Sequence, residues 1–438
     1  MPNQNQRTAS VPDINVRAEI IALVLAVVVT TMTIPAQAQA FQVIHTFTGG
    51  ADGANPAGAG ITLDQAGNLY GATLDGGLAE SDCYTGSCGT VFKISHRGSG
   101  WTFNTLYKFT GGSDGALPDT PVTFAPNGVL YGTTYYGGAA CSYEYGCGTV
   151  FSLQPSPTAC KSALCPWTEN VLYRFTGGSG SDPTYGALSF DAGGNLYGTT
   201  SGGGAHGQGN VYELTPSSGG WAQQALYSFT GNLDGGSPRG SVIFDPIGNL
   251  YGTTSDGGYY SGGTVFELSP SGQGWSLQVL HAIEAQTDGY LPYGNLFLDP
   301  SGNLWGTDNA GGPGAGGTAF KLTPSNGSWD FSVLYPFNGN PFSGPTGNLV
   351  MDPQGNLYGA RVGAGTHACG SVFKLTPNGS GWTETVLYSF TWGSDGEEPY
   401  GQIARDADGN LYGTTWVGGM TGGVCGTGGC GVVWEITP

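Results

Sequence analysis

The chain has 438 residues, 81 of them glycine, and carries a formal net charge of −19 at pH 7. Its few Lys and Arg residues are scattered, so it lacks the basic clusters that binding to nucleic acid or to an anionic membrane surface would need, and we expect neither partner. Helix formers are sparse and no long stretch has a helical apolar period, so the composition predicts an almost entirely β protein with glycine-rich turns.

The first forty residues differ from the rest. An apolar run at 20–34 is followed by Ala38-Gln39-Ala40, a pattern typical of a secretory signal peptide (residues 1–40) cleaved before Phe41. The alternative is an uncleaved N-terminal anchor, although the run is short for a membrane span. After cleavage we expect no membrane insertion and a periplasmic or extracellular protein.

One short motif then recurs seven times, at intervals of 61, 66, 54, 54, 53 and 54 residues. The copies are GNLYG (67–71), GVLYG (128–132), GNLYG (194–198), GNLYG (248–252), GNLWG (302–306), GNLYG (355–359) and GNLYG (409–413). A period in this range is typical of solenoids and propellers. Each copy predicts four short strands: strand a before the motif, strand b on it, strand c like GTVFKI (89–94), and a Trp-led strand d ending like LYSF (226–229).

The two ends of the mature chain are out of phase with this unit. The chain begins with an isolated strand d (41–48) and finishes with a strand c (431–438) that no strand d follows. Pairing these two strands would complete a seventh sheet and leave no open sheet edge. We therefore predict an all-β fold, a single seven-bladed β-propeller over 41–438, in which 41–48 completes the last blade with 399–438.

The repeat D..GNLYGTT..GG....GTVFKLTP, which covers essentially all of 41–438, resembles the GloVer tandem repeat of bacterial secreted proteins. This resemblance implies export and the repeat fold. It implies no activity, cofactor or site residue.

Eight of the nine cysteines form close pairs in the sequence. The pairs are Cys83 with Cys88, Cys141 with Cys147, Cys160 with Cys165, and Cys425 with Cys430. Zinc ligation would favour Cys-x-x-Cys spacing with nearby His, which is absent from the sequence, so we predict disulfides. Cys369 has no partner in this pattern; the favoured interpretation is a leftover of the repeat, and the alternatives are a reactive or an intermolecular thiol.

The loops between blades repeat an Asp-Gly pair. The aspartates are Asp52, Asp114, Asp234, Asp288 and Asp395. Carboxylates at equivalent positions on one rim could bind Ca²⁺, but the favoured interpretation is a turn in which each Asp bonds its own backbone. We predict no other cofactor or metal and no catalytic residue, since no catalytic triad can be recognised.

Breaks in the repeat indicate where a function could lie. The last residue of strand b is Thr in five copies but Asp308 and Arg361 in two neighbouring ones, which predicts a salt bridge between them or an asymmetric site. A core position of strand a becomes Arg405, and a buried Arg requires a carboxylate partner or a ligand.

The predicted loop face is rich in aromatic residues. They are Tyr135, Tyr136, Tyr143, Tyr145, Tyr259, Tyr260, Tyr290, Trp392 and Trp416, with Glu397 and Glu398 nearby. Aromatic planes beside carboxylates suit sugars, and exposed aromatics also mark protein interfaces.

We therefore expect an exported, non-catalytic and monomeric scaffold or binding module that holds carbohydrate or protein on its loop face. The alternative is a propeller hydrolase, lactonase or lyase with a site at the channel mouth, built from Arg361, Asp308 and rim carboxylates.

Overall fold

The computed structural model describes residues 40–437 except 57, 79–82, 84, 99, 126, 139–140, 142–144, 156–166, 184, 273, 380 and 423–424. The predicted signal peptide, apart from Ala40, lies outside the described residues, as does Tyr143. No helix long and apolar enough to cross a membrane occurs in the described part of the chain.

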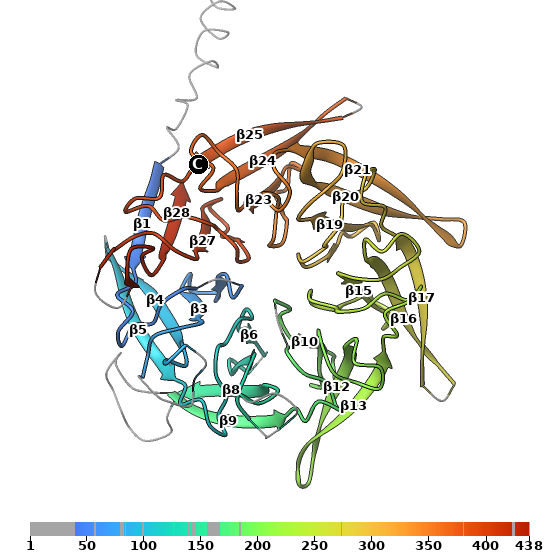
Figure 1. The fold of residues 1–438 in the computed structure, drawn as a ribbon, viewed down its shortest axis with the longest axis horizontal. Helices are drawn as coiled ribbons and strands as arrows, with labels where there is room; N and C mark the ends of the chain where they lie inside the picture. The colour runs from blue at the N-terminus through green and yellow to red at the C-terminus, as the bar shows by residue number, and fades with distance from the viewer. Residues whose placement is uncertain are drawn as a thin grey trace, which may run out of the picture. The chain divides into compact units, whose positions relative to one another are not determined.

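Seven four-stranded antiparallel sheets form a ring of blades, and in each blade the strand order is a, b, c, d (Figure 1). Numbered along the chain, blade 1 is β2–β5 and blade 7 is β26–β28 with β1. The strands a are β2 (Thr62–Leu63), β6 (Thr123–Phe124), β10 (Ser189–Phe190), β14 (Ile243–Phe244), β18 (Phe297–Leu298), β22 (Val350–Met351) and β26 (Ala404–Arg405). The strands b are β3 (Leu69–Thr73), β7 (Leu130–Thr134), β11 (Leu196–Thr200), β15 (Leu250–Thr254), β19 (Leu304–Asp308), β23 (Leu357–Arg361) and β27 (Leu411–Thr415).

The longer strands c and d form the outer part of each blade, with strand d outermost in Figure 1. The strands c are β4 (Thr90–Arg97), β8 (Thr149–Pro155), β12 (Asn210–Ser217), β16 (Thr264–Ser271), β20 (Ala315–Ser325), β24 (Ser371–Asn378) and β28 (Val432–Thr437). The strands d are β5 (Gly100–Lys108), β9 (Trp167–Arg174), β13 (Gly220–Ser228), β17 (Gly274–Ala282), β21 (Ser328–Asn338), β25 (Gly381–Ser389) and β1 (Ala40–Thr46).

The predicted closure of the ring is confirmed. Strand β1 pairs antiparallel with β28, placing Phe41 opposite Ile436 and Val43 opposite Trp434. Phe41 also stacks on Tyr388 of the preceding blade, with ring centroids 3.7 Å apart. The first and last strands of the propeller therefore share one sheet, and no blade is left with an unpaired strand c.

The glycine in the middle of each strand b is explained by the core of the blade. A Cβ added at Gly252 would lie 2.6 Å from Cζ of Phe266 on strand c. The same position on strand c holds fully buried Phe92, Phe151, Phe320 and Phe373, replaced by Tyr212 and Trp434 in two blades. Large rings on strand c therefore require the repeated glycine on strand b.

The Asp and Asn of the repeat build the a–b hairpin. In blade 3, Asp191 Oδ1 accepts from the backbone N–H groups of Gly193 and Asn195 at 2.8 and 2.9 Å. Its Oδ2 accepts from Asn195 Nδ2 at 2.8 Å and Tyr197 OH at 3.2 Å. Burial alone would raise the pKa of Asp191, but these hydrogen bonds outweigh it and lower the pKa.

The same network adapts to substitutions between copies. Where Trp305 replaces the tyrosine, its Nε1–H donates to Asp299 at 2.9 Å. In blade 2, Ala125 and Val129 stand in place of Asp and Asn, and Val129 N–H bonds Asn127 Oδ1 instead. The repeated Asp, Asn and aromatic residues are thus the parts of one hydrogen-bonded turn.

Candidate functional site

The d–a loop of each blade pairs with the segment that follows strand b, so the two loops share one face of the propeller, as predicted. Examples are the bridges Ala116↔Tyr136 and Glu397↔Val417. Each d–a loop also contacts the blade before it: Asn55 N–H donates to the carbonyl of Cys430 at 2.8 Å. Residues of different blades therefore come together on this face.

Within each d–a loop, a Pro is followed by a residue that differs from copy to copy. At or next to this position the blades have Ala57, Asp119, Tyr185, Arg239, Tyr293, Thr346 and Tyr400. Five of these residues, Asp119, Tyr185, Arg239, Tyr293 and Tyr400, influence one another electrostatically. They come from blades 2, 3, 4, 5 and 7, which can meet only around the ring centre. We name them the central cluster.

The central cluster borders two adjoining hollows, which we call the central pocket. The larger has a volume of about 360 Å³ and is lined by Leu74, Asp75, Thr85, Leu117, Asp119, Tyr135, Tyr136, Tyr185, Ser201, Arg239 and Trp416. The smaller, about 150 Å³, shares Leu74, Asp119, Tyr185 and Trp416 with it and adds Tyr400. Polar groups within an aromatic wall are typical of a small-ligand site.

Asp119 is the most buried charged residue of the central pocket, with 8% of its surface exposed. Its Oδ1 accepts a hydrogen bond from Gly58 N–H at 2.9 Å, and its second oxygen has no partner among the described residues. Burial, reinforced by the charge of Asp75 and opposed by Arg239 and the Gly58 bond, raises the pKa of Asp119 to about 7. Below that pH the side chain is a neutral acid that can donate a hydrogen bond.

Arg239 lies over two aromatic rings. Its Cζ is 4.9 Å from the ring centroid of Tyr293 and 5.6 Å from that of Tyr185, and these rings are parallel to within 7°. Its Nε is buried without a hydrogen-bond partner. Among the described residues, Arg239 makes neither a hydrogen bond nor an ion pair. The two rings position the guanidinium, and its N–H donors are left without an acceptor among the described residues.

Three of the predicted aromatic residues form the wall of this pocket. The rings of Tyr135 and Tyr136 lie 4.4 Å apart. Trp416, with 37% of its surface exposed, packs edge-on against Tyr400 at 5.5 Å. These side chains present ring faces and edges beside Asp119 and Arg239.

The other predicted aromatic and acidic residues do not line the central pocket. Trp392 is 58% exposed, and Tyr259 packs edge-on against Tyr260 on the surface. Tyr145 contacts the ring of Tyr136 at 5.9 Å, and Tyr290 contacts Phe342 at 6.0 Å. Burial raises the pKa values of both Glu397 and Glu398; Glu397 faces Cys369, and Glu398 acts electrostatically on Tyr400.

The predicted salt bridge between Asp308 and Arg361 is wrong. Asp308 is fully buried; one oxygen accepts from Thr318 Oγ1 at 2.9 Å, and the other has no partner in the described part of the chain. Burial raises the pKa of Asp308 well above its usual range. Arg361 instead pairs with Glu384 of its own blade, at 3.5 Å, and donates to the Asn338 carbonyl at 2.8 Å. Neither residue lines the central pocket, so they do not form the predicted mouth site.

The carboxylate partner expected for Arg405 is also not found among the described residues. Its guanidinium carbon lies 5.9 Å from the ring centroid of Tyr358, and its Nε is buried without a hydrogen bond. Arg405 is only partly buried, so its charge keeps some contact with water and needs no buried counter-ion.

The Asp-Gly carboxylates are bound within their own turns. Asp114 accepts from Thr110 N–H at 3.0 Å, Thr110 Oγ1 at 2.6 Å and Tyr107 OH at 3.0 Å. In two blades His45 and His281 replace that tyrosine and contact Asp52 and Asp288. In the described part of the chain, no group of three or more His, Cys, Asp or Glu side chains could hold a metal ion. These contacts favour the turn interpretation over a Ca²⁺ rim.

Three of the four predicted disulfides are confirmed: Cys83–Cys88, Cys141–Cys147 and Cys425–Cys430, with Cα atoms 5.4, 6.0 and 5.1 Å apart. The fourth predicted pair falls within 156–166, outside the described residues, so a disulfide between Cys160 and Cys165 stays a prediction. Cys369 is free and buried, and its thiol contacts the His367 carbonyl at 3.3 Å.

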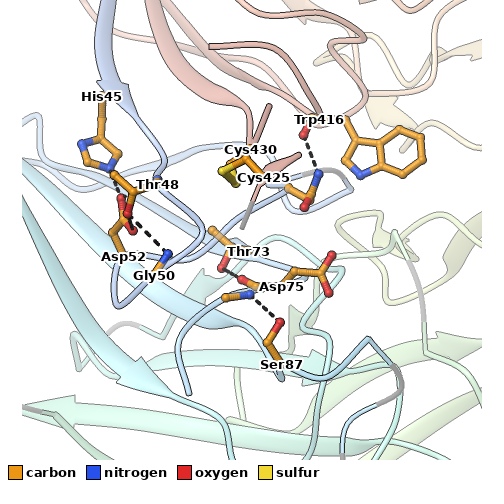
Figure 2. Close-up of a disulfide and its surroundings, with 12 residues drawn as sticks. His45, Thr48, Gly50, Asp52, Thr73, Asp75, Ser87, Trp416, Cys425 and Cys430 are labelled. Carbon is orange, nitrogen blue, oxygen red and sulfur yellow. Dashed lines mark hydrogen bonds and ion pairs between the residues drawn. A yellow bond between two sulfur atoms is a disulfide. The ribbon is translucent and has the colours of Figure 1, made fainter. Parts of the chain in front are cut away.

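The Cys425–Cys430 disulfide borders a second pocket, of about 660 Å³, at the seam between blades 7 and 1 (Figure 2). Its wall is made mostly of glycine loops, together with Asn55 and Asp75. Asn55 Nδ2 donates to the Trp416 carbonyl at 3.1 Å, and Gly76 N–H donates to Ser87 Oγ at 2.9 Å. Asp75 lines both this pocket and the central one.

Asp119, Tyr185, Arg239, Tyr293 and Tyr400 are not among the residues that the sequence analysis selects. A feature of the sequence could have identified them. Every d–a loop contains a Pro, and a residue that differs between copies follows it within two positions. The substitutions inside strands, Asp308, Arg361 and Arg405, lie in single blades away from this pocket, whereas Tyr135, Tyr136 and Trp416 of the predicted loop face do line it.

Comparison with solved structures gives distant likenesses, among them the following three. A protein of unknown function from Dyadobacter fermentans has a TM-score of 0.45 at 11% identity, covering 91% of this chain and 98% of its own. A sialidase from Streptococcus pneumoniae has 0.44 at 11%, covering 93% and 72%. A gluconolactonase from Xanthomonas campestris has 0.38 at 15%, covering 73% and 98%. These scores carry no argument about activity.

A comparison with curated proteins finds no match. The model of the Gloeobacter/Verrucomicrobia repeat matches residues 28–163 and 142–350. This match spans most of the chain and includes the hairpin motif, so the chain belongs to the Gloeobacter/Verrucomicrobia repeat family.

Proposed function

We propose that the protein is an exported, non-catalytic binding module and that its central pocket holds a carbohydrate. The observation that carries this proposal is the pair Asp119 and Arg239 inside an aromatic wall: among the described residues, one Asp119 oxygen and the Arg239 guanidinium have no hydrogen-bond partner. Sugars combine hydroxyl groups, which need such partners, with C–H faces that pack on aromatic rings. Trp416 and Tyr136 supply those rings.

Export is supported by the leader and by three disulfides, which persist in oxidising compartments. We therefore place the module in the periplasm or outside the cell, where polysaccharides are accessible.

The test is a glycan array probed with the purified protein, with and without Ca²⁺. We expect selective retention of a group of glycans, independent of Ca²⁺, and loss of that retention in Trp416→Ala. The matched control is Trp392→Ala, because Trp392 is exposed but does not line the pocket. Equal loss in both variants, or no retention of any glycan, would contradict the proposal.

One observation favours hydrolysis as a second function. Asp75 and Asp119 line the same pocket, burial is the main cause that raises both pKa values, and the charge of Asp75 contributes to raising the pKa of Asp119. A carboxylic acid that titrates near neutral pH, beside a second carboxylate, is suited to general acid catalysis on a glycoside. Turnover of a glycoside panel that disappears in Asp119→Asn would establish this alternative in place of the non-catalytic module.

A further inference from the structure

The loop of Arg239 is held by hydrogen bonds, but its guanidinium has no hydrogen-bond or ion-pair partner among the described residues. Its loop is fixed by the hydrogen bond from Thr199 Oγ1 to the Gly240 carbonyl, at 3.0 Å, and by the bond between Ser241 N–H and Asn295 Oδ1. The guanidinium lies over Tyr185 and Tyr293. An arginine in such a setting, whose donors have no acceptor in the described part of the chain, is prepared for an acceptor on a ligand.

We propose that the sugar bound at the proposed carbohydrate site, on which this inference rests, carries a carboxylate, as a uronic acid does. Arg239 is the residue that binds this carboxylate. A guanidinium presents parallel N–H groups in one plane, which match the two oxygens of a carboxylate. A sugar hydroxyl offers a single acceptor and would use this arrangement poorly. The carbohydrate ring would then pack on the aromatic wall beside Arg239.

The charges around Arg239 are consistent with an anionic ligand at this point. Asp119 and Asp182 act on the guanidinium electrostatically, yet no carboxylate forms an ion pair with it among the described residues. The net charge of −19 repels anions mainly at long range, where salt screens it over about 10 Å. The local contact therefore decides binding.

Asp119 makes the contact dependent on pH. The titratable groups that act on it or line the pocket with it are Asp75, Tyr135, Tyr136, Tyr185, Arg239 and Tyr400. Burial raises the pKa of Asp119 to about 7, so the side chain is neutral below that pH and anionic above it. An anionic Asp119 would repel the ligand carboxylate and compete for Arg239, so affinity for an acidic sugar should fall as pH rises through about 7.

The experiment compares oligogalacturonates with their methyl esters by isothermal titration, using the full mature chain. The ester removes the negative charge while the sugar stereochemistry stays the same. Alginate and glucuronate oligomers serve as further acidic probes. We expect at least one acidic oligomer to bind about tenfold or more tightly than its neutral counterpart at pH 6, and we expect this preference to shrink by pH 8.5.

The variants separate the roles of the two residues. Arg239→Ala should abolish the preference for the acid, and Arg239→Lys should keep the charge but lose most of the preference, because a lysine cannot form the paired bonds. Asp119→Asn should bind the acid with the same affinity at pH 6 and 8.5. The control Arg97→Ala, at an exposed hairpin end, should behave as wild type.

The outcomes distinguish this inference from the proposed function. Neutral glycans that bind as well as acidic ones, with binding lost in Trp416→Ala, would overturn the role of Arg239 and leave the carbohydrate site standing. An acid preference that survives Arg239→Ala would also overturn it. If no glycan binds, both proposals fail.

Discussion

The a–b hairpin recurs in every blade, and the central cluster is drawn from equivalent loop positions of five blades, yet the copies vary in opposite ways at the two places. At the hairpin, six of the seven copies have the same Asp and Asn, and the carboxylate is saturated by hydrogen bonds within its own turn, as Asp191 shows. In the central cluster the copies have different residues, and Asp119 and Arg239 each keep a polar group that has no partner among the residues that the structure describes.

The difference follows from what each residue contacts. The hairpin aspartate makes its hydrogen bonds within its own blade, as Asp191 and Asp406 show, so the same solution works in every copy. A residue after the loop Pro meets residues of other blades around the ring centre, where one ligand would meet all of them at once. Identical residues there could not present an acid, a guanidinium and aromatic rings together.

The stabilising role of the hairpin network can be tested in blade 7. Asp406→Ala removes an acceptor of Asn410 N–H, Asn410 Nδ2 and Tyr412 OH, and we expect it to lower the free energy of unfolding by about 2 kcal/mol. Asp408→Ala, in the same turn but exposed, makes the same charge change and should alter it by less than about 0.5 kcal/mol. Chemical denaturation measures both. Equal effects would show that charge, rather than the turn network, is responsible.

Blade 5 offers a stabilising change. Asp308→Thr should recreate the pair that Thr254 and Thr264 form at 2.9 Å in blade 4, with Thr318 as partner, and should raise the free energy of unfolding by about 1 kcal/mol at pH 7. Burial raises the pKa of Asp308 above its pKa in the unfolded chain. The neutral side chain costs the folded state little at low pH, but the folded state loses stability as pH rises above the pKa of the unfolded chain.

The advantage of Asp308→Thr over wild type should therefore be larger at pH 8 than at pH 4. Thermal unfolding at the two pH values measures this difference. Asp119 is present in both proteins, so its own titration cancels. An advantage that is greater at pH 4 would contradict the assignment of a buried, neutral Asp308.

The smallest expected effect is in blade 2, the copy without the hairpin network. The double change Ala125→Asp with Val129→Asn installs the D-P-x-G-N sequence of residues 245–249. We expect a gain of up to about 1 kcal/mol, seen as a small rise in melting temperature, with ligand binding unchanged. The single change Val129→Asn is the control, and should give less. A loss of stability in the double variant would contradict the view of the motif as a self-contained turn.

The ring, its closure and three disulfides follow from the sequence because they depend on spacing within or between copies. Side-chain contacts at positions that vary between copies do not follow from it. The partner of Arg361 is Glu384, on the outer strand of the same blade, and nothing in the repeat marks a strand-d glutamate as a buried counter-ion. Likewise Trp392 and Trp416 look alike in the sequence, but only Trp416 reaches the ring centre.

The most direct test of the central claim, that function lies where the d–a loops converge, compares Trp416→Ala and Arg239→Ala with Trp392→Ala and a Tyr259→Ala/Tyr260→Ala double variant in one binding titration. The glycan that the wild-type protein retains on the array is the ligand. We predict that each of the first two variants weakens binding about tenfold or more at unchanged melting temperature, and that the last two bind as wild type. Loss of binding in the surface variants, with binding intact in Trp416→Ala and Arg239→Ala, would contradict the account.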